Sequence, residues 1–469
     1  TLVSFAIAPA RADQLVTAEF KKSDDPVYLF TAPKGDYEGT LAMWDRFHEL
    51  CQSGKVRAAW ALTSGGVAEG LMKMCFGNRI GFVGAEHLKG TKLFAPACGS
   101  IIAELSEDVD FGEKIGRTAF PPILEAGGAY LPLDDLQAVW ESTLEDVYPT
   151  RLKSEEPEQT EEDKLDDPMS SIHCEVGRHG QADLVPEITC DQRSNRAPAA
   201  KTARPRAVIP VFPGTNCEYD TANACLRAGI EPKILVVRNL TTDLLTQSAH
   251  ELEEAIKGAQ MIILPGGFSG GDEPEGSGKF IASFFRNERI KDAVHDLLKN
   301  RDGLMLGICN GFQALIKLGL VPYGDIRPIT AYDPTLTFNT IGRHQSMLVR
   351  TRVASTGSPW LSHCDAGSEY EIAISHGEGR FVAPQNVLDQ LVANGQVATQ
   401  YVDLEGEPTM DQRYNPNGSL LAIEGITSPD GRVFGKMGHS ERSGEYLYKN
   451  VTGDKYQPIF EGGVDYFKV

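Results

Sequence analysis

Cys309 is the residue whose surroundings most favour chemistry, within the stretch LMLGICNGFQALIKLG (304–319). Residues 304–306 predict a buried strand, and residues 312–318 have the apolar spacing of a helix. Cys309 therefore lies at a strand-to-helix corner, and glycines two positions before and after it permit a sharp turn. The N-terminus of the following helix favours the thiolate, which is the form that attacks a carbonyl. The alternative is a small buried apolar residue, as unpaired cysteines often are.

His439 is the best candidate for the base that a cysteine nucleophile requires. It follows a predicted short strand at 432–434. In extended backbone, positions 439 and 441 point to the same side, so Glu441 can hold the ring nitrogen that His439 does not offer to the sulfur. A His-x-Glu pair by itself is often only a surface feature. Combined with a cysteine at a strand-to-helix corner, it predicts a Cys-His-Glu triad.

Acyl chemistry also needs N–H donors aimed at the developing oxyanion, each contributing roughly 3 kcal/mol. The amide of Asn310 follows the nucleophile directly and is the first candidate. The amide of Gly267 or Phe268 is the second, because a glycine-rich strand end leaves its amides unpaired. The alternative is that the Pro-Gly-Gly run before Phe268 is a simple turn.

The elements that must position these residues predict a doubly wound α/β domain over residues 206–469. Strand and helix alternate there at short spacing, which favours a mainly parallel sheet. Ligands gather at the carboxyl ends of the strands of such a sheet, where both Cys309 and Gly267 are expected. One long amphipathic helix is predicted at about 278–300, before the strand that leads to the cysteine.

Two further segments precede this domain. Residues 1–149 have the mixed pattern of a separate α/β domain, and residues 150–205 predict a linker, acidic at first and later rich in Pro, Ala and Arg, that cannot bury enough surface to fold alone. Four potential metal ligands in the linker match no zinc spacing, so we expect no metal site: His173, Cys174, His179 and Cys190.

Composition limits the classes of function. The formal net charge of -20 argues against a nucleic-acid-binding surface and favours small-molecule chemistry. No run approaches the roughly 18 apolar residues of a membrane helix. Nine cysteines, odd in number and without a CxxC pair, suit a reducing cytoplasm better than a disulfide framework. The chain starts with a strand-like segment at Thr1, which suggests a piece of a longer polypeptide.

The first domain contains, in order, the segments AAWALTSGGVAEGLMKMCFGNRIGF, LFAPACGSIIAEL, EKIGRTA and VWESTL. On these segments it resembles the C-terminal domain of the AIR-synthetase superfamily. The family's turn usually reads Asp-x-Ser-x-Gly-Gly, whereas the turn around Ser64-Gly65-Gly66 has no acidic residue. A glycine turn that opens a helix can cradle a phosphate, but a tight turn and a structural half-repeat are the simpler interpretation.

The second domain contains, in order, the segments PVFPGTNCEYDTANACLRAG, LPGGFSGGDEPEGSG, GICNGFQALIKLGLVP, ISHGEGRF, NPNGS and GITSPDGRVFGKMGHSER. On these segments, which span nearly all of residues 206–469, it resembles the glutaminase domains of the phosphoribosylformylglycinamidine synthetase family, which serve purine biosynthesis. An AIR-synthetase-like domain ahead of it has the order found in the large, single-chain form of that family.

The resemblance implies a class I triad in which Cys309 attacks the side-chain carbonyl of glutamine, with His439 as base and Glu441 as its orienting partner. A thioester and ammonia would form, and water would release glutamate. Gln313, His376 and Glu378 would help to hold the substrate, although the loop carrying the last two has an ordinary polar loop as its alternative. Many relatives have Pro where Ser440 stands, which leaves the spacing from His to Glu intact.

The resemblance also implies a synthetase partner. In the family, ammonia passes to a site that uses ATP and magnesium to convert formylglycinamide ribonucleotide to the amidine, and most of that site would lie in an N-terminal synthetase portion upstream of Thr1. No P-loop occurs in this chain, so we expect no cofactor here. We therefore expect this chain alone to hydrolyse glutamine weakly and to make no amidine.

Two other functions stay open from the sequence. A stand-alone Cys-His-Glu hydrolase of γ-glutamyl compounds would act on γ-glutamyl peptides and would have no use for the first domain. A catalytically idle assembly scaffold would leave Cys309 unmodified by a glutamine-analogue electrophile.

Overall fold

The computed structural model describes residues 10–11, 14–88, 90–142, 145, 175–177, 185–194, 196–198, 200–269 and 278–468. The chain forms two compact units. The small unit combines Leu2–Ser142 with Thr340–Arg343, and the large unit combines Thr143–Asn339 with His344–Val469. The division after Ser142 lies near the predicted boundary at residue 149. The assignment of Thr340–Arg343 to the small unit was not predicted.

The small unit is built on one seven-stranded sheet with the order β2-β4-β1-β5-β3-β6-β7. The neighbouring strands are antiparallel except β3 and β6, which are parallel. The strands are β1 Pro26–Phe30, β2 Val56–Ala61, β3 Gly81–Gly84, β4 Ile101–Leu105, β5 Glu113–Ala119, β6 Ile123–Ala126 and β7 Ala129–Pro132. The helices are α1 Tyr37–Gln52, α2 Gly66–Phe76, α3 Thr91–Phe94 and α4 Leu133–Glu141. Helix α1 begins where the Asp36 carboxylate accepts the amide of Gly39 and buries Met43 and Phe47.

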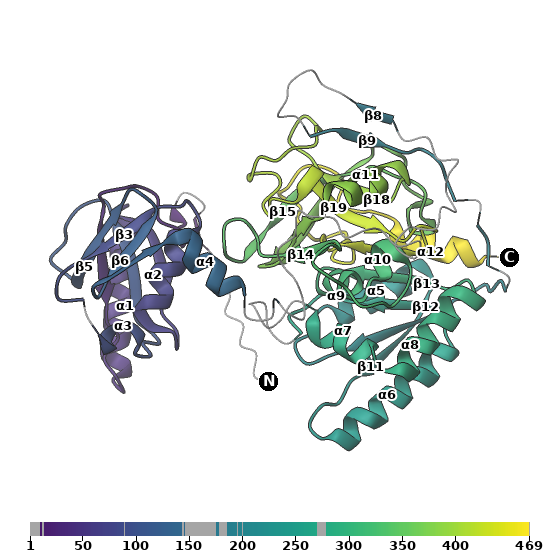
Figure 1. The fold of residues 1–469 in the computed structure, drawn as a ribbon, viewed down its shortest axis with the longest axis horizontal. Coiled ribbons are helices and arrows are strands. Elements are labelled where there is room, and N and C mark those ends of the chain that lie inside the picture. Colours follow the sequence, from purple (N-terminus) through teal and green to yellow (C-terminus); the bar gives the residue numbers. More distant parts are fainter. Residues whose placement is uncertain are drawn as a thin grey trace. The chain divides into compact units, whose positions relative to one another are not determined.

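The large unit is built on a nine-stranded sheet with the order β11-β10-β12-β13-β20-β19-β18-β15-β16. Figure 1 labels β11, β12, β13, β15, β18 and β19 of this sheet. From β11 to β20 all neighbours are parallel, and from β20 to β16 all are antiparallel. Its strands are β10 Arg206–Val211, β11 Glu231–Val236, β12 Met261–Leu264, β13 Leu304–Ile308, β15 Gln345–Val353, β16 Glu369–His376, β18 Val397–Tyr401, β19 Ile423–Thr427 and β20 Val433–Lys436. The predicted α/β class is confirmed, and the predicted parallel sheet continues into an antiparallel half.

Helices cover both faces of the parallel half. The chain moves from β10 to β11 toward one edge of the sheet, and then from β11 to β12 and β13 toward the other edge. Because such crossovers are right-handed, α5 lies on one face of the sheet and α6 to α9 lie on the other. Contacts between α5 and α12, between α6 and α8, and between α7 and α9 agree with this arrangement. The α-helices of the large unit are α5 Glu218–Ala228, α6 Thr242–Lys257, α7 Lys279–Phe285, α8 Glu288–His295, α9 Asn310–Leu318, α10 Leu320–Tyr323, α11 Gln385–Ala393 and α12 Ile459–Phe467.

The remaining elements are short. They are the strand pairs β8 Glu175–Gly177 with β9 Glu187–Thr189 and β14 Thr335–Thr337 with β17 Arg380–Val382, the π-helical turn η3 Asp296–Asn300, and the 3₁₀ turns η4 Pro359–Leu361 and η5 Leu420–Ala422.

The prediction of one long helix at 278–300 is wrong. The segment contains α7, α8 and the turn η3, and the first break falls at Asn287, whose backbone is extended. The Asn287 side chain accepts the amide of Arg289 and so starts a new helix. Asparagine satisfies orphan N–H groups well at this position, and this capping outweighs the continuous apolar pattern.

One end of the predicted linker is an ordered part of the large unit. Arg352 on β15 donates to the carbonyl of Ile188 (2.8 Å) and to the side chains of Glu187 and Thr189, which fixes β9. The amide of Cys190 bonds to the carbonyl of Ala354, and Cys190 is disulfide-bonded, unlike the free cysteines expected. His173, Cys174, His179 and most of residues 143–184 lie outside the described residues.

The described helices include none with the length and apolar character that crossing a membrane requires.

Candidate active site

The corner at Cys309 is held by close packing of glycines. Cys309 has φ +52° and ψ −107°, between the buried strand β13 and helix α9. A Cβ on Gly311 would lie 2.1 Å from the carbonyl oxygen of Leu264, and one on Gly307 would lie 2.5 Å from Leu315 Cδ1. The glycines therefore allow α9 to approach the sheet closely, which forces the cysteine into its strained backbone conformation. The Cys309 Sγ lies 3.8 Å from the carbonyl oxygen of Ser375.

His439 and Glu441 follow the neighbouring strand. Strands β13 and β20 are parallel with Ile308 opposite Lys436, and the amide of Cys309 donates to the carbonyl of Lys436 (2.8 Å). In the turn that follows β20, His439 Nδ1 lies 2.6 Å from Glu441 Oε1, and both side chains are buried. Burial raises the pKa of the Glu441 carboxyl, but the charge of His439 and the hydrogen bond from it lower that pKa overall. The carboxylate is therefore ionised and fixes the tautomer of the imidazole.

Gly266 shows where the imidazole of His439 lies. Gly266 follows β12, which pairs with β13 on the side opposite β20. A Cβ on Gly266 would lie only 2.5 Å from His439 Cε1. The ring therefore reaches from the end of β20 to the end of β12, across the end of the intervening strand that leads to Cys309.

We expect Gly266→Ala to lower the rate of a reaction that uses this imidazole as its base about a hundredfold, because the added methyl group must push the imidazole aside and a displacement of about 1 Å has this effect. The measurement is kcat together with the melting temperature. Gly258→Ala is the matched control, because the nearest atom to its Cβ is 3.7 Å away. Equal kcat for Gly266→Ala and wild type would contradict the placement of the ring.

The structure corrects one of the predicted oxyanion donors. The amide of Phe268 donates to the carbonyl of Gly214 (2.8 Å), so it is not available to a substrate. This bond and the one from the Asn216 amide to the Gly266 carbonyl form an antiparallel bridge between Thr215 and Gly267. Neither the amide nor the carbonyl of Gly267 takes part in these two bonds. Gly267 has φ +151°, and a Cβ there would lie 2.6 Å from the Cα of Thr215. The amide of Asn310 is one of the first four of helix α9, which have no partner within the helix.

The side chains of Asn310 and Gln313 connect the surrounding loops. Asn310 Oδ1 accepts from the Ser269 hydroxyl (2.6 Å), and its Nδ2 donates to Gln313 Oε1 (2.8 Å). Gln313 Nε2 in turn donates to the carbonyl of Glu378 (2.5 Å). Gln313, itself held by Asn310, therefore attaches residues 376–379 to helix α9 beside Cys309. Substrate binding by Gln313 stays a prediction.

His376 and Glu378 are both buried. Burial lowers the pKa of His376 to about 3, and its Nε2 lies 2.8 Å from Asn417 Oδ1, so the ring is neutral. Glu378 faces the buried Lys317, whose pKa burial lowers to about 8 while Glu378 opposes that effect. In the structure His376 is therefore a neutral hydrogen-bond donor, and Glu378 compensates the charge of Lys317. Their contact with substrate stays a prediction.

The loop at 375–379 is also bonded to residues on either side of Thr340–Arg343. Asn339 donates from Nδ2 to the carbonyl of His376 (2.9 Å) and accepts the amide of Gly379 (3.1 Å). His344 Nε2 lies 2.9 Å from the Ser375 hydroxyl, and its ring packs near that of Phe268. Within the small unit, Arg343 forms an ion pair with Glu19.

Sequence reasoning missed Cys217 and Arg442. The Cys217 Sγ lies 3.9 Å from His439 Nδ1 and accepts a hydrogen bond from Arg442 Nη2 (2.9 Å). Burial and the charge of Glu441 raise the pKa of Cys217 to about 12, so it is a thiol. No local pattern marks Cys217, because its neighbours in space come from strands far away in the sequence.

A buried lysine supports the turn that carries the His439–Glu441 pair. Lys436 Nζ donates to Ser440 Oγ (2.6 Å) and Gln457 Oε1 (2.7 Å), and Glu424 Oε1 lies 3.8 Å away. The same Glu424 oxygen accepts the amide of Gly438 (2.5 Å). The hydroxyl of Ser440 thus joins a polar network that a proline at this position would not form.

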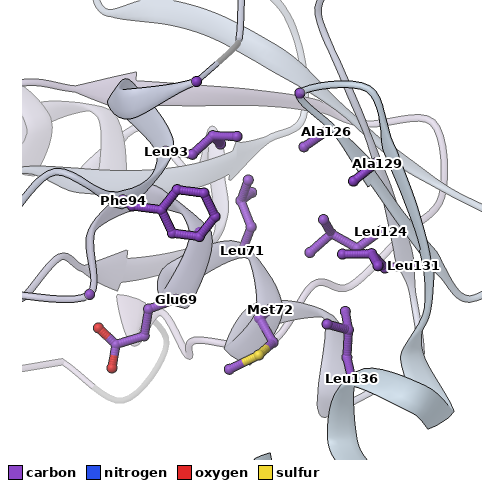
Figure 2. Close-up of a pocket in the computed structure, with 14 residues that line it drawn as sticks. Glu69, Leu71, Met72, Leu93, Phe94, Leu124, Ala126, Ala129, Leu131 and Leu136 are labelled. Carbon is purple, nitrogen blue, oxygen red and sulfur yellow. The ribbon is translucent and has the colours of Figure 1, made fainter. Parts of the chain in front are cut away.

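The Ser64-Gly65-Gly66 turn opens α2 beside a cavity of about 470 Å³ in the small unit. Its lining is mainly leucine, alanine and other apolar side chains, and Figure 2 shows Glu69 at the edge of this lining. A Cβ on Gly65 would lie 2.3 Å from Glu69 Oε2, and Thr63 Oγ1 donates to the same oxygen (2.5 Å). A carboxylate therefore stands at the helix N-terminus, and its charge opposes phosphate there.

Comparisons with known proteins match the large unit. A family model described as a CobB/CobQ-like glutamine amidotransferase domain matches residues 204–467. A phosphoribosylformylglycinamidine synthase subunit PurQ of Chlorobium chlorochromatii is 35% identical over 246 residues, which are 52% of this chain and 91% of that protein. The PurQ of Salinibacter ruber is 33% identical over 264 residues, 56% and 96% respectively. A structure of PurLQS from Thermotoga maritima has 28% identity and a TM-score of 0.41, and covers 56% of this chain and 99% of that one.

Proposed function

The chain belongs to the CobB/CobQ-like family of glutamine amidotransferases, and from this membership we propose that it hydrolyses glutamine to supply ammonia for phosphoribosylformylglycinamidine synthesis in purine biosynthesis. The named relatives are synthase subunits that align over most of their length, which supports this choice within the family. Cys309 is the nucleophile of the proposal, His439 the base and Glu441 the orienting carboxylate.

The proposed reaction begins when His439 takes the proton of the Cys309 thiol. The thiolate attacks the side-chain carbonyl carbon of glutamine, and the oxyanion that forms accepts hydrogen bonds from the amides of Asn310 and Gly267. The imidazolium returns the proton to the leaving nitrogen, which departs as ammonia and leaves a thioester. Water, deprotonated by the same imidazole, then releases glutamate and restores the thiol.

The observation that carries this proposal is the buried hydrogen bond between His439 and Glu441, at the end of the strand beside Cys309. The bond orients one ring nitrogen and leaves the other for a thiol. The strained corner at Cys309, followed by the N-terminus of α9, provides the matching position for a nucleophile.

The wider assignments belong to the same proposal. An N-terminal synthetase portion that uses ATP and Mg²⁺ would receive the ammonia, and the small unit would be an AIR-synthetase-like C-terminal domain of that portion. The seven free cysteines among the described residues suit a cytoplasmic location.

The direct test incubates the chain with glutamine and, separately, with γ-glutamyl peptides, and measures glutamate and ammonia. We expect slow release of both products from glutamine and no cleavage of the peptides. A preference for γ-glutamyl peptides would replace the proposal with a peptide hydrolase. Absence of labelling at Cys309 by a glutamine-analogue electrophile would favour an idle scaffold.

A further inference from the structure

Three side chains of the kinds that bind zinc meet behind the imidazole of His439. The Cys217 Sγ, His439 Nδ1 and a Glu441 carboxylate oxygen all lie within 4.8 Å of one another, and all three residues are buried. The measured pairs are 3.9 Å from sulfur to nitrogen and 2.6 Å from nitrogen to oxygen. Metal–ligand bonds of about 2.0–2.3 Å would need only small side-chain shifts from these positions.

The backbone holds Cys217 in this place. The amides of Asn216 and Cys217 both donate to the carbonyl of Gly266 (3.4 and 3.3 Å), which attaches the turn after β10 to the end of β12. A Cβ on Gly266 would lie 3.1 Å from the Cys217 Sγ as well as against the imidazole. The sulfur and the ring are therefore packed against the same glycine.

The carboxylate of Glu441 has an unused oxygen. Its Oε1 binds His439, whereas its buried Oε2 has no hydrogen-bond partner among the described residues. A buried carboxylate oxygen without a donor costs free energy. This orphan atom is a second indication that the cluster can accept a ligand of positive charge.

We propose that Cys217, His439 and Glu441 bind a divalent transition metal such as Zn²⁺, and that the bound metal inhibits the glutaminase by occupying the base and its partner. The inhibition rests on the proposed function, whereas the metal binding does not. Cys217 releases its thiol proton to solvent, and His439 remains neutral by moving its proton from Nδ1 to Nε2. Thiolate and carboxylate then balance the two positive charges of the ion, which a buried site requires.

In the present structure the Cys217 sulfur of this cluster contacts a cationic side chain, that of Arg442. Its Nη2 donates to the Cys217 Sγ (2.9 Å), and its Nε lies 3.6 Å from Asp220 Oδ2. In the proposed metal complex the guanidinium gives up the sulfur and keeps its contact with Asp220.

The binding test uses the full chain with Cys309→Ala, which removes the thiol that the proposed function pairs with His439. We expect Cd²⁺ to bind at one equivalent with a thiolate-to-metal charge-transfer band in the ultraviolet, and both Cys217→Ser and Cys217→Ala to abolish the band. Cys225→Ser is the matched control, because Cys225 is a buried thiol on the adjoining helix α5 outside the cluster. A band that survives in both Cys217 variants would overturn the proposal.

The inhibition test measures glutamine hydrolysis against Zn²⁺ concentration in chains that retain Cys309. We expect Cys217→Ala to raise the half-inhibiting concentration at least about tenfold, and Cys225→Ser to leave it unchanged. Equal inhibition of wild type and Cys217→Ala would mean that zinc acts at Cys309, and the inhibitory site would be rejected. If the chain hydrolyses no glutamine, the cadmium experiment still decides whether the cluster binds metal.

Discussion

Replacing Cys309 by alanine should lower the rate of glutamine hydrolysis by about 10⁴-fold or more, because without the sulfur no thioester can form. The corner itself should survive, since Cys309 is only 2% exposed and the flanking glycines that set the turn are unchanged. The decisive measurement pairs kcat with intact-protein mass after exposure to a glutamine-analogue electrophile. We expect one covalent adduct on wild type and none on the alanine variant.

Cys364→Ala is the control for this substitution. Cys364 is also a free, buried cysteine of the large unit, but burial raises its pKa to about 11, so its thiol is unreactive at neutral pH. Its variant should keep both the adduct and the rate. If Cys309→Ala retained most of the activity, the nucleophile would have to be sought elsewhere.

Replacing Glu441 by glutamine is expected to lower kcat about a hundredfold or more with little change in KM. The neutral amide can no longer stabilise the imidazolium, and it can present its NH₂ to Nδ1 and so select the wrong tautomer. The exposed Glu445, four residues later, gives Glu445→Gln as a matched control with the same chemical change. A proportional rise in KM with kcat unchanged would instead indicate that Glu441 binds substrate.

The pH dependence of stability provides a second measurement for Glu441. Because the folded pKa of this carboxyl is lowered, its contribution to the free energy of unfolding is complete above the pKa of an unfolded carboxyl and is lost as the pH falls through the folded value. The stability difference between wild type and Glu441→Gln should therefore be largest near neutral pH and shrink in acid. A difference that did not change with pH would show that the carboxylate charge contributes nothing to folding.

The sequence was informative where the chemistry depends on local pattern. The glycines around Cys309 and the spacing between His439 and Glu441 are short-range features, and the corner and the hydrogen bond that they predict are present. The long helix at 278–300 failed because one capping asparagine, Asn287, outweighed a continuous apolar period. The sequence pattern near a residue therefore predicts a turn more reliably than it predicts where a helix ends.

Features that depend on strand order could not be predicted. Cys217 meets His439 only because β10, β12, β13 and β20 are neighbours in this order, which no spacing along the chain expresses. The amide of Phe268 was one of two alternatives for the second oxyanion donor, but it pairs with Gly214 through the same long-range arrangement. The antiparallel half of the sheet was missed for a related reason, since its strands lack the regular alternation with helices.

The membership of Thr340–Arg343 in the small unit has a consequence for dividing the gene. A fragment that begins at residue 206 would carry these four residues without the neighbours that they have in the small unit, such as Glu19 for Arg343. The residues on either side of the stretch, Asn339 and His344, bond to the loop beside Cys309. A fragment cut at residue 206 would therefore keep the bonds of Asn339 and His344 but lose the small-unit partner of Arg343 between them.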